Sequence, residues 1–193
     1  LLFLSQKTSK NPYIKQLQSI VNPQSKQNIN RINIWKSTLD MIPEKPIFGY
    51  GPGNWKLHAP NFHKGRFKEE TELNWQRPHN DFLWILAEKG PIGLLLYLAV
   101  FTLIFYYLIS VIKTNQDYYD KHLALLLIFG LTMYLSASFF DFPYERVFHH
   151  TFLALTFAVS LSLYLKTNTL KTLHVNPLFT LIPVGIAIFG FVY

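Results

Sequence analysis

The stretch IGLLLYLAVFTLIFYYLISVI, residues 92–112, contains 21 residues without a formal charge. A helix needs about 20 predominantly apolar residues to cross a hydrocarbon core about 30 Å thick. Residues 92–112 are therefore predicted to span a membrane as one helix. Half of the 193-residue chain is hydrophobic, which is more than one small soluble domain needs and is consistent with a membrane-embedded protein.

Further apolar stretches are expected to form membrane helices, namely residues 123–140, 147–165 and 178–193. The second of these qualifies if His149 and His150 are neutral at the level of the lipid headgroups. The fold class is therefore predicted to be all-α, a polytopic integral membrane protein.

The chain divides into three parts. Residues 1–4 begin without a methionine and are expected to be the end of a truncated transmembrane helix, so the chain is interpreted as a fragment. Residues 5–80 form a long, partly helical loop region outside the membrane. Residues 81–193 form the membrane domain.

Positive charge is concentrated in residues 5–80, which carry a net charge of +7, whereas residues 81–193 are neutral overall. Most of these lysines and arginines can be explained as a solvated loop, and the alternative is a cationic surface for anionic lipid or a pyrophosphate. A nucleic-acid partner is not expected, because no recognition motif accompanies the charge. The chain has no cysteine, which excludes disulfides and thiolate chemistry.

Short loops indicate the orientation, because the Lys/Arg rule does not apply to loops longer than about 60 residues. Lysines flank the loop after residues 92–112 and the loop after residues 147–165: Lys113, Lys121, Lys166 and Lys171. Both loops are therefore expected on the cytoplasmic side, which places residues 5–80 and the turn 141–146 on the extracytoplasmic side.

An amphipathic helix is predicted over residues 31–42, because one face would carry the apolar side chains of Ile32, Trp35, Leu39 and Ile42. Pro43 and Pro46 would end it. The glycine-rich residues 49–54 favour a turn over a phosphate-binding loop, since their spacing matches neither known phosphate motif.

A second helix is expected to begin near Pro78 and to run to Gly90, where Gly90 and Pro91 would break or kink it before the membrane span. His79 is thus expected near the N-terminal end of the segment that leads into a transmembrane helix. An imidazole has an unperturbed pKa of about 6.5 and can accept a proton from a hydroxyl near neutral pH.

A set of motifs runs from residue 31 to residue 93: Arg31 with Trp35, then PIFGYGPGN at residues 46–54, then His79-Asn80, and finally Gly90-x-x-Gly93. Together they resemble the O-antigen ligase family of bacterial membrane proteins, a superfamily that includes polymerases and protein O-oligosaccharyltransferases. The resemblance covers residues 30–100. One departure is Leu94-Leu95, where the ligase motif often has two threonines.

The resemblance implies a metal-independent glycosyltransferase of the bacterial inner membrane, with its long loop in the periplasm. The donor would be a glycan on undecaprenyl pyrophosphate, and the acceptor a hydroxyl of lipid A core, another glycan or a protein. In this scheme His79 activates the acceptor hydroxyl and Arg31 holds the pyrophosphate leaving group. A guanidinium suits that role because it offers paired donors to phosphate oxygens and stays charged.

Three further residues are expected to bind substrate: Arg77, Asn80 and Arg146. Each has an alternative role, since Arg77 could be a surface residue, Asn80 could cap the following helix, and Arg146 could contact lipid headgroups from a solvated turn.

No metal site and no cofactor are expected. His58 and His63 lie five residues apart in a loop, a spacing that zinc motifs do not favour. A glycosidase is disfavoured, because Asp141 and Glu145 lie in one short turn instead of facing each other across a cleft.

Two alternatives to ligation remain open. One is polymerisation of repeat units on the same carrier. The other is a non-catalytic transporter or scaffold, which we consider less consistent with residues 92–112 and 123–140, because these stretches contain no ionisable acid or base of the kind that transport pathways need at mid-bilayer.

Overall fold

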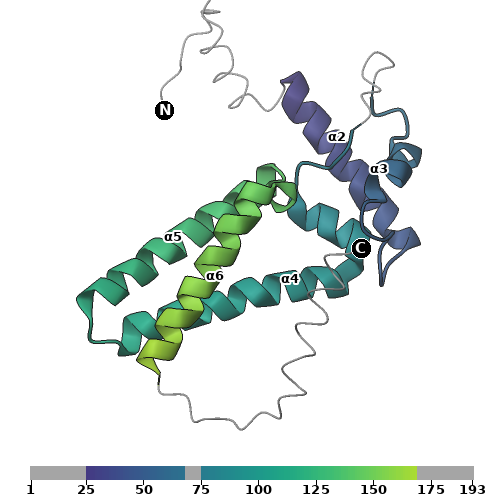
Figure 1. The fold of residues 1–193 in the computed structure, drawn as a ribbon. Helices are drawn as coiled ribbons and strands as arrows, with labels where there is room; N and C mark the ends of the chain where they lie inside the picture. Colours follow the sequence, from purple (N-terminus) through teal and green to yellow (C-terminus); the bar gives the residue numbers. More distant parts are fainter. Residues whose placement is uncertain (1–24, 68–74, 169–193) are drawn as a thin grey trace, which may run out of the picture.

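The computed structural model describes residues 25–67 and 75–168, and every regular element in these residues is helical. The helices and 3-10 turns follow in the order α2 (Lys26–Met41), η1 (Ile42–Glu44), α3 (Trp55–His58), η2 (Ala59–Phe62), α4 (Asp81–Thr114), α5 (Tyr118–Phe140), η4 (Pro143–Glu145) and α6 (Val147–Thr167). In Figure 1, α4, α5 and α6 form a bundle, and α2 and α3 gather at one of its ends.

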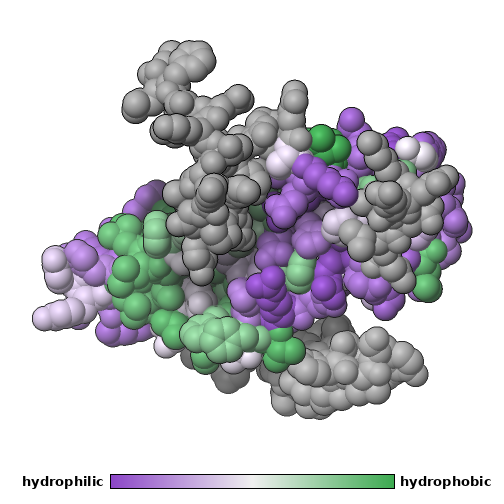
Figure 2. Space-filling view, turned by 90° about the horizontal axis from the view of Figure 1, so that it is seen from above, coloured by the Kyte–Doolittle hydropathy of each residue, from purple (hydrophilic) through white to green (hydrophobic). Residues whose placement is uncertain are grey.

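Three of the described helices, α4, α5 and α6, are long and apolar enough to cross a membrane. Their shared core is apolar and consists of Phe101, Ile104, Leu108, Val111, Ala124, Leu131 and Leu163. Figure 2 shows, on the face it presents, a hydrophobic belt across the bundle between hydrophilic surfaces at the two ends. The prediction of an all-α membrane protein is confirmed for the described residues.

The predicted span 92–112 is the longer part of α4, and the predicted helix before Gly90 is the shorter part. The two parts are joined by a kink at Gly90, where φ is 68° and ψ is −177°. Pro91 has no N–H to donate to the Ala87 carbonyl, so the kink leaves backbone acceptors without their usual helical partners. The expected kink is therefore confirmed, and the first part begins at Asp81, shortly after Pro78.

The glycine-rich turn supplies the missing donors. The backbone N–H of Tyr50 donates to the Ala87 carbonyl at 2.9 Å, and that of Gly51 donates to the Glu88 carbonyl at 2.8 Å. The turn and the kink touch through their backbones, since a Cβ on Gly90 would lie 1.9 Å from the Ile47 carbonyl oxygen. The glycines thus permit close packing, as expected for a turn.

The Glu88 side chain reinforces this junction. Its two carboxylate oxygens accept hydrogen bonds of 2.9 Å from the backbone N–H groups of Gly53 and Trp55. Trp55 in turn is fully buried and donates its indole N–H to the Thr38 hydroxyl of α2 at 3.0 Å. A buried acid therefore connects α4 to α2 through α3.

The predicted apolar face of the first helix is wrong in part, since Trp35 and Ile42 pack against the core of the loop region but Ile32 and Leu39 do not. Ile32 and Leu39 are 42% and 50% exposed, while the buried residues of α2 are Ile34, Ser37, Thr38 and Met41. Ser37 and Thr38 can be buried because their hydroxyls donate to backbone carbonyls one turn earlier, at 3.0 and 2.8 Å. Their polarity is thereby satisfied within the helix, which a hydropathy pattern does not register.

Two expectations lie outside the described residues: the truncated helix at residues 1–4 and the fourth membrane helix at residues 178–193. The division into a loop region and a membrane domain stays a prediction.

Gly90→Ala is expected to destabilise the full-length protein. The new methyl group would collide with the Ile47 carbonyl, and Ala would also be strained at a φ of 68°, for a cost on the order of 1–3 kcal/mol. The midpoint of thermal unfolding in detergent micelles should fall.

Gly130→Ala on α5 is the matched control, because a Cβ there meets no atom within 4 Å. Ala is favoured over Gly within a helix by about 1 kcal/mol, so this midpoint should stay constant or rise. An equal fall in both variants would contradict the close backbone contact at Gly90.

Candidate functional site

Three segments meet beside the end of the bundle where α4 begins. They are the approach to α4 at residues 75–80, the helix α2, and the turn at residues 141–146 that joins α5 to α6. Ion pairs and ring contacts connect the turn to the approach segment. The predicted site residues all belong to these three segments.

His79 has an unusual backbone conformation. Its φ is 54°, in the left-handed region that non-glycine residues seldom adopt. The next residue, Asn80, is extended and caps α4, since its side chain accepts the Leu83 N–H at 3.0 Å. The capping role that we expected as an alternative for Asn80 is therefore confirmed, and only 3% of Asn80 is exposed.

Helix α2 is fastened to the segment that carries His79. The Trp35 indole N–H donates to the Pro78 carbonyl at 2.9 Å. Arg31 lies one helical turn before Trp35, and residues four apart share a helix face. Trp35 therefore turns the face that carries Arg31 toward His79.

Aromatic rings enclose the His79 imidazole. The rings of Trp75 and Phe142 contact it edge-on, with centroid distances of 5.7 and 5.0 Å. The imidazole Nδ1 is buried without a hydrogen bond and lies 3.8 Å from a carboxylate oxygen of Asp141. One quarter of the His79 side chain is exposed, so the site is open to a reactant.

The environment lowers the pKa of His79 below its ordinary value of 6.5. Burial is the largest cause, and the positive charge of Arg31 is the next. Asp141 raises the pKa and Arg77 lowers it, both by smaller amounts. The neutral imidazole, which is the form that can accept a proton, is therefore favoured near neutral pH.

Both arginines near the turn have carboxylate partners. Arg77 makes a two-point ion pair with Glu145, in which Nη2 donates at 2.7 Å and Nε faces the other oxygen. Arg146 donates to Asp141 at 2.8 Å. Arg31 differs from them, because it has no ion pair among the residues that the structure describes.

The structure reveals two site residues that the sequence did not indicate, Asp81 and Phe142, and it places Asp141 of the same turn beside His79. The buried Asp81 carboxylate accepts the Tyr144 N–H at 3.0 Å and so fixes the turn to the first residue of α4. The alternative of a merely solvated turn does not describe this contact. The sequence DFPYER of this turn places charged and aromatic residues between two apolar helices, and this pattern was the available indication that the turn belongs to the site.

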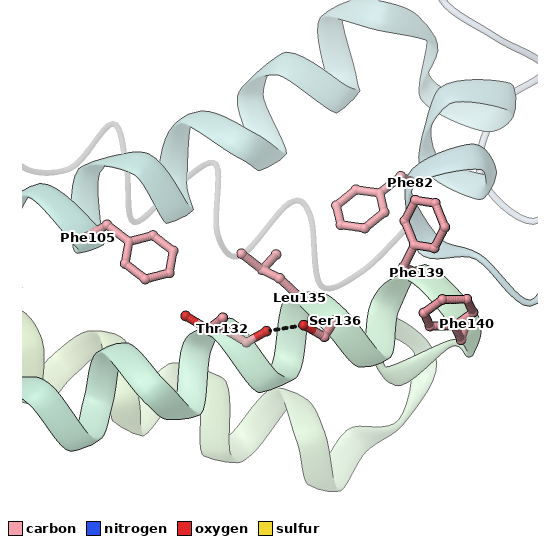
Figure 3. A pocket seen from close by; sticks show the side chains of 7 residues that line it. All are labelled: Phe82, Phe105, Thr132, Leu135, Ser136, Phe139 and Phe140. Carbon is pink, nitrogen blue, oxygen red and sulfur yellow. Dashed lines mark hydrogen bonds between the residues drawn. The ribbon is translucent and has the colours of Figure 1, made fainter. Parts of the chain in front are cut away.

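A groove opens between α4 and α5. It has a volume of about 440 Å³ and is lined by Phe82, Phe105, Thr132, Leu135, Ser136, Phe139 and Phe140 (Figure 3). The two hydroxyls donate to backbone carbonyls of their own helix at 2.8 Å, which leaves the lining largely apolar. Phe139 connects the groove to the site, because its ring contacts the Trp35 ring with a centroid distance of 5.8 Å.

Among the described residues, no three side chains of the metal-binding types gather closely enough to hold a metal ion. The two loop histidines have other contacts. The ring centroid of His58 lies 4.7 Å from that of Tyr50, and the ring centroid of His63 lies 4.6 Å from that of Phe67.

Comparison with known proteins gives consistent results. A family model for O-antigen ligase matches residues 2–98. A Haemophilus influenzae protein of unknown character is 30% identical over 88 residues, which are 45% of this chain and 22% of that protein. A Rickettsia conorii protein named "Putative polysaccharide ligase" is 35% identical over 78 residues, 37% of this chain and 18% of that protein. The aligned segments thus span about a fifth of these relatives, and no solved structure matches the chain.

Charge substitutions should move the pKa of His79 in opposite directions. Asp141→Asn removes a charge that raises this pKa and should lower it, whereas Arg31→Gln removes a charge that lowers it and should raise it. The measurement is the rate at which diethyl pyrocarbonate modifies His79 as a function of pH, read by mass spectrometry, because only the neutral imidazole reacts.

Lys36→Gln is the control, since it removes a positive charge from an exposed position of the same helix α2. Its midpoint should equal that of the unmodified protein. If all three variants titrate alike, the electrostatic description of His79 is wrong.

Proposed function

Because the chain belongs to the O-antigen ligase family, we propose that it transfers a glycan from undecaprenyl pyrophosphate to an acceptor hydroxyl. The acceptor is the lipid A core or another glycan or protein. The reaction takes place at the periplasmic face of the bacterial inner membrane.

The observation that carries this proposal is that α2, which carries Arg31, is hydrogen-bonded through Trp35 to the residue before His79. Arg31 and His79 come from α2 and from the approach to α4, and the charge of Arg31 still acts on the His79 imidazole. A group that can accept a proton and a group that can stabilise a leaving anion therefore belong to one site. The transfer of a sugar from a pyrophosphate requires both functions.

In this proposal His79 is the general base. With Nδ1 directed at Asp141, Nε2 is left to accept the proton of the acceptor hydroxyl. The hydroxyl oxygen forms a bond to the anomeric carbon, and the bond from that carbon to the pyrophosphate oxygen breaks. General-base assistance of this kind contributes typically about 10²- to 10⁴-fold to the rate.

Arg31 receives the pyrophosphate. As the oxygen leaves, negative charge develops on the pyrophosphate, and a guanidinium stabilises it with paired donors. Arg77 and Arg146 already face Glu145 and Asp141, so Arg31 is the guanidinium whose donors are uncommitted among the ion pairs of the described residues. We assign Arg77 and Arg146 to the outer contacts of the donor.

The groove beside Phe139 supports a lipid-linked donor. An isoprenoid chain is apolar, and the lining of the groove is largely apolar as well. A carrier whose chain lies in the groove would present its pyrophosphate toward Trp35 and the neighbouring Arg31.

The proposed orientation in the membrane is argued from the end of the bundle that lies opposite His79. Lys113 and Lys121 flank the α4–α5 loop, and Lys166 lies in the last turn of α6. Lysines in short loops favour the cytoplasm, and the His79 end is then periplasmic. The scheme assigns proton transfer to a histidine and charge stabilisation to an arginine, and so it requires neither a metal nor a cofactor.

His79→Ala in the full-length protein should lower glycan transfer by at least about 10²-fold, because the general base is lost. His79→Asn tests the same loss in a residue that tolerates the left-handed backbone better. His122→Ala is the matched control, since His122 is exposed on α5 near the other end of the bundle.

Gel analysis of surface polysaccharide provides the measurement and separates the alternatives. Loss of all capped lipid together with accumulation of polymer on the carrier supports a ligase, whereas capped lipid with a single repeat indicates a polymerase. Unchanged polysaccharide in both His79 variants would reject the enzyme proposal and favour a scaffold.

Arg31→Lys should lower kcat for transfer while leaving the protein folded. A lysine keeps the charge but loses the paired donors that match phosphate oxygens, and the loss should be roughly tenfold or more, as for a charge-assisted hydrogen bond made in the transition state. The measurement is the rate of transfer in proteoliposomes from a lipid pyrophosphate donor. Lys36→Arg is the control, and equal rates for Arg31→Lys and the unmodified protein would contradict the assigned role.

A further inference from the structure

Phe142 occupies the centre of the charged site. The guanidinium carbon of Arg77 lies 4.5 Å from the centroid of its ring, and that of Arg146 lies 4.8 Å from it. The His79 ring contacts the same phenyl ring, with a centroid distance of 5.0 Å and an angle of 69° between the ring planes. One aromatic side chain thus contacts two cations and the imidazole.

The neighbours of Phe142 in sequence complete this arrangement. A carboxylate oxygen of Asp141 lies 3.8 Å from the Nδ1 atom of His79, and Asp141 also forms an ion pair with Arg146. Glu145 forms an ion pair with Arg77. Arg77 and Arg146 are therefore each contacted by a carboxylate and by the phenyl ring of Phe142. Guanidinium groups are attracted to aromatic faces, and this attraction strengthens where water is excluded.

We propose that Phe142 is a positioning residue, whose ring holds the guanidinium groups of Arg77 and Arg146 beside His79. Through these contacts it favours the neutral form of the imidazole. This inference rests on the proposed function, in which neutral His79 is the base. Phe142 itself has no group that can exchange a proton, so it acts only through the residues that it contacts.

Two physical effects support the proposal. The phenyl ring covers part of the imidazole, and desolvation disfavours a charged imidazole. The ring also keeps Arg77 near His79, and the positive charge of Arg77 lowers the His79 pKa. The opposing influence is Asp141, and its effect is moderated because Arg146 shares that carboxylate.

The other charges that face His79 come from different elements. Arg31 acts on His79 from α2, and Glu145 is neutralised by Arg77. Substitution of Phe142 leaves Arg31 in place, because Trp35 and not Phe142 fastens α2 to Pro78. A change at Phe142 should therefore report on the ring and on the two arginines that it contacts.

The test compares three substitutions in the full-length protein. Phe142→Ala removes the ring, Phe142→Leu keeps apolar bulk without an aromatic face, and Phe142→Tyr keeps the ring. Phe148→Ala is the matched control, because Phe148 is also aromatic and is 70% exposed on α6. Size-exclusion chromatography and circular dichroism verify that each variant is folded.

The first readout is the pH dependence of His79 modification by diethyl pyrocarbonate. We expect the Ala variant to have a higher midpoint, with His79 modified roughly twofold or more slowly at pH 6 than in the unmodified protein. The Leu variant should be intermediate, and the Tyr variant and Phe148→Ala should be unchanged. An unchanged midpoint in a folded Phe142→Ala variant would overturn the proposal.

The second readout is glycan transfer at pH 6 and pH 8. If Phe142 keeps His79 neutral, the Ala variant should lose more activity at pH 6 than at pH 8, and Tyr should restore it. An equal loss at both pH values indicates a merely structural role and overturns the proposal. Modification of His79 needs no transfer activity, so a failure of the proposed function, seen as full transfer by His79→Ala, is distinguishable from a failure of this inference.

Discussion

The fold depends on the docking of a glycine-rich turn onto a broken helix. Pro91 and the kink at Gly90 free two carbonyls of α4, and the backbone N–H groups of Tyr50 and Gly51 bind them. Buried backbone acceptors need partners, so the break and the turn are complementary. This contact fixes the segment that contains α2 and α3 against the bundle, and it thereby determines where Arg31 lies relative to His79.

The charges of the site are organised by the α5–α6 turn. Its carboxylates engage Arg77 and Arg146, its phenyl ring contacts both arginines, and its Tyr144 N–H is held by the buried Asp81. Arg31 stands apart on α2 with no ion pair in the described part of the chain. Among the described residues the site therefore contains two arginines paired with carboxylates and one without an ion pair, around an imidazole that favours its neutral form.

The motif set selected His79 and Arg31 as site candidates, and their catalytic roles stay predictions. The membrane helices could be predicted from the sequence, because their apolar runs match the bilayer thickness. The buried face of α2 could not, since Ser37 and Thr38 satisfy their hydroxyls within the helix and pack like apolar residues. The positions of Asp141 and Phe142 beside His79 could not either. They arise from contacts between segments about sixty residues apart, and no local periodicity encodes such contacts.

The left-handed backbone at His79 has a consequence for the stability of this segment. A left-handed φ of 54° costs free energy in most residues, and glycine would relieve that cost while removing the imidazole. With His79 as the base that we propose, backbone stability and catalysis therefore favour different residues at this position. In the proposed mechanism a glycine here would relax the backbone and abolish the base, so the strained histidine is a stability cost that the reaction requires.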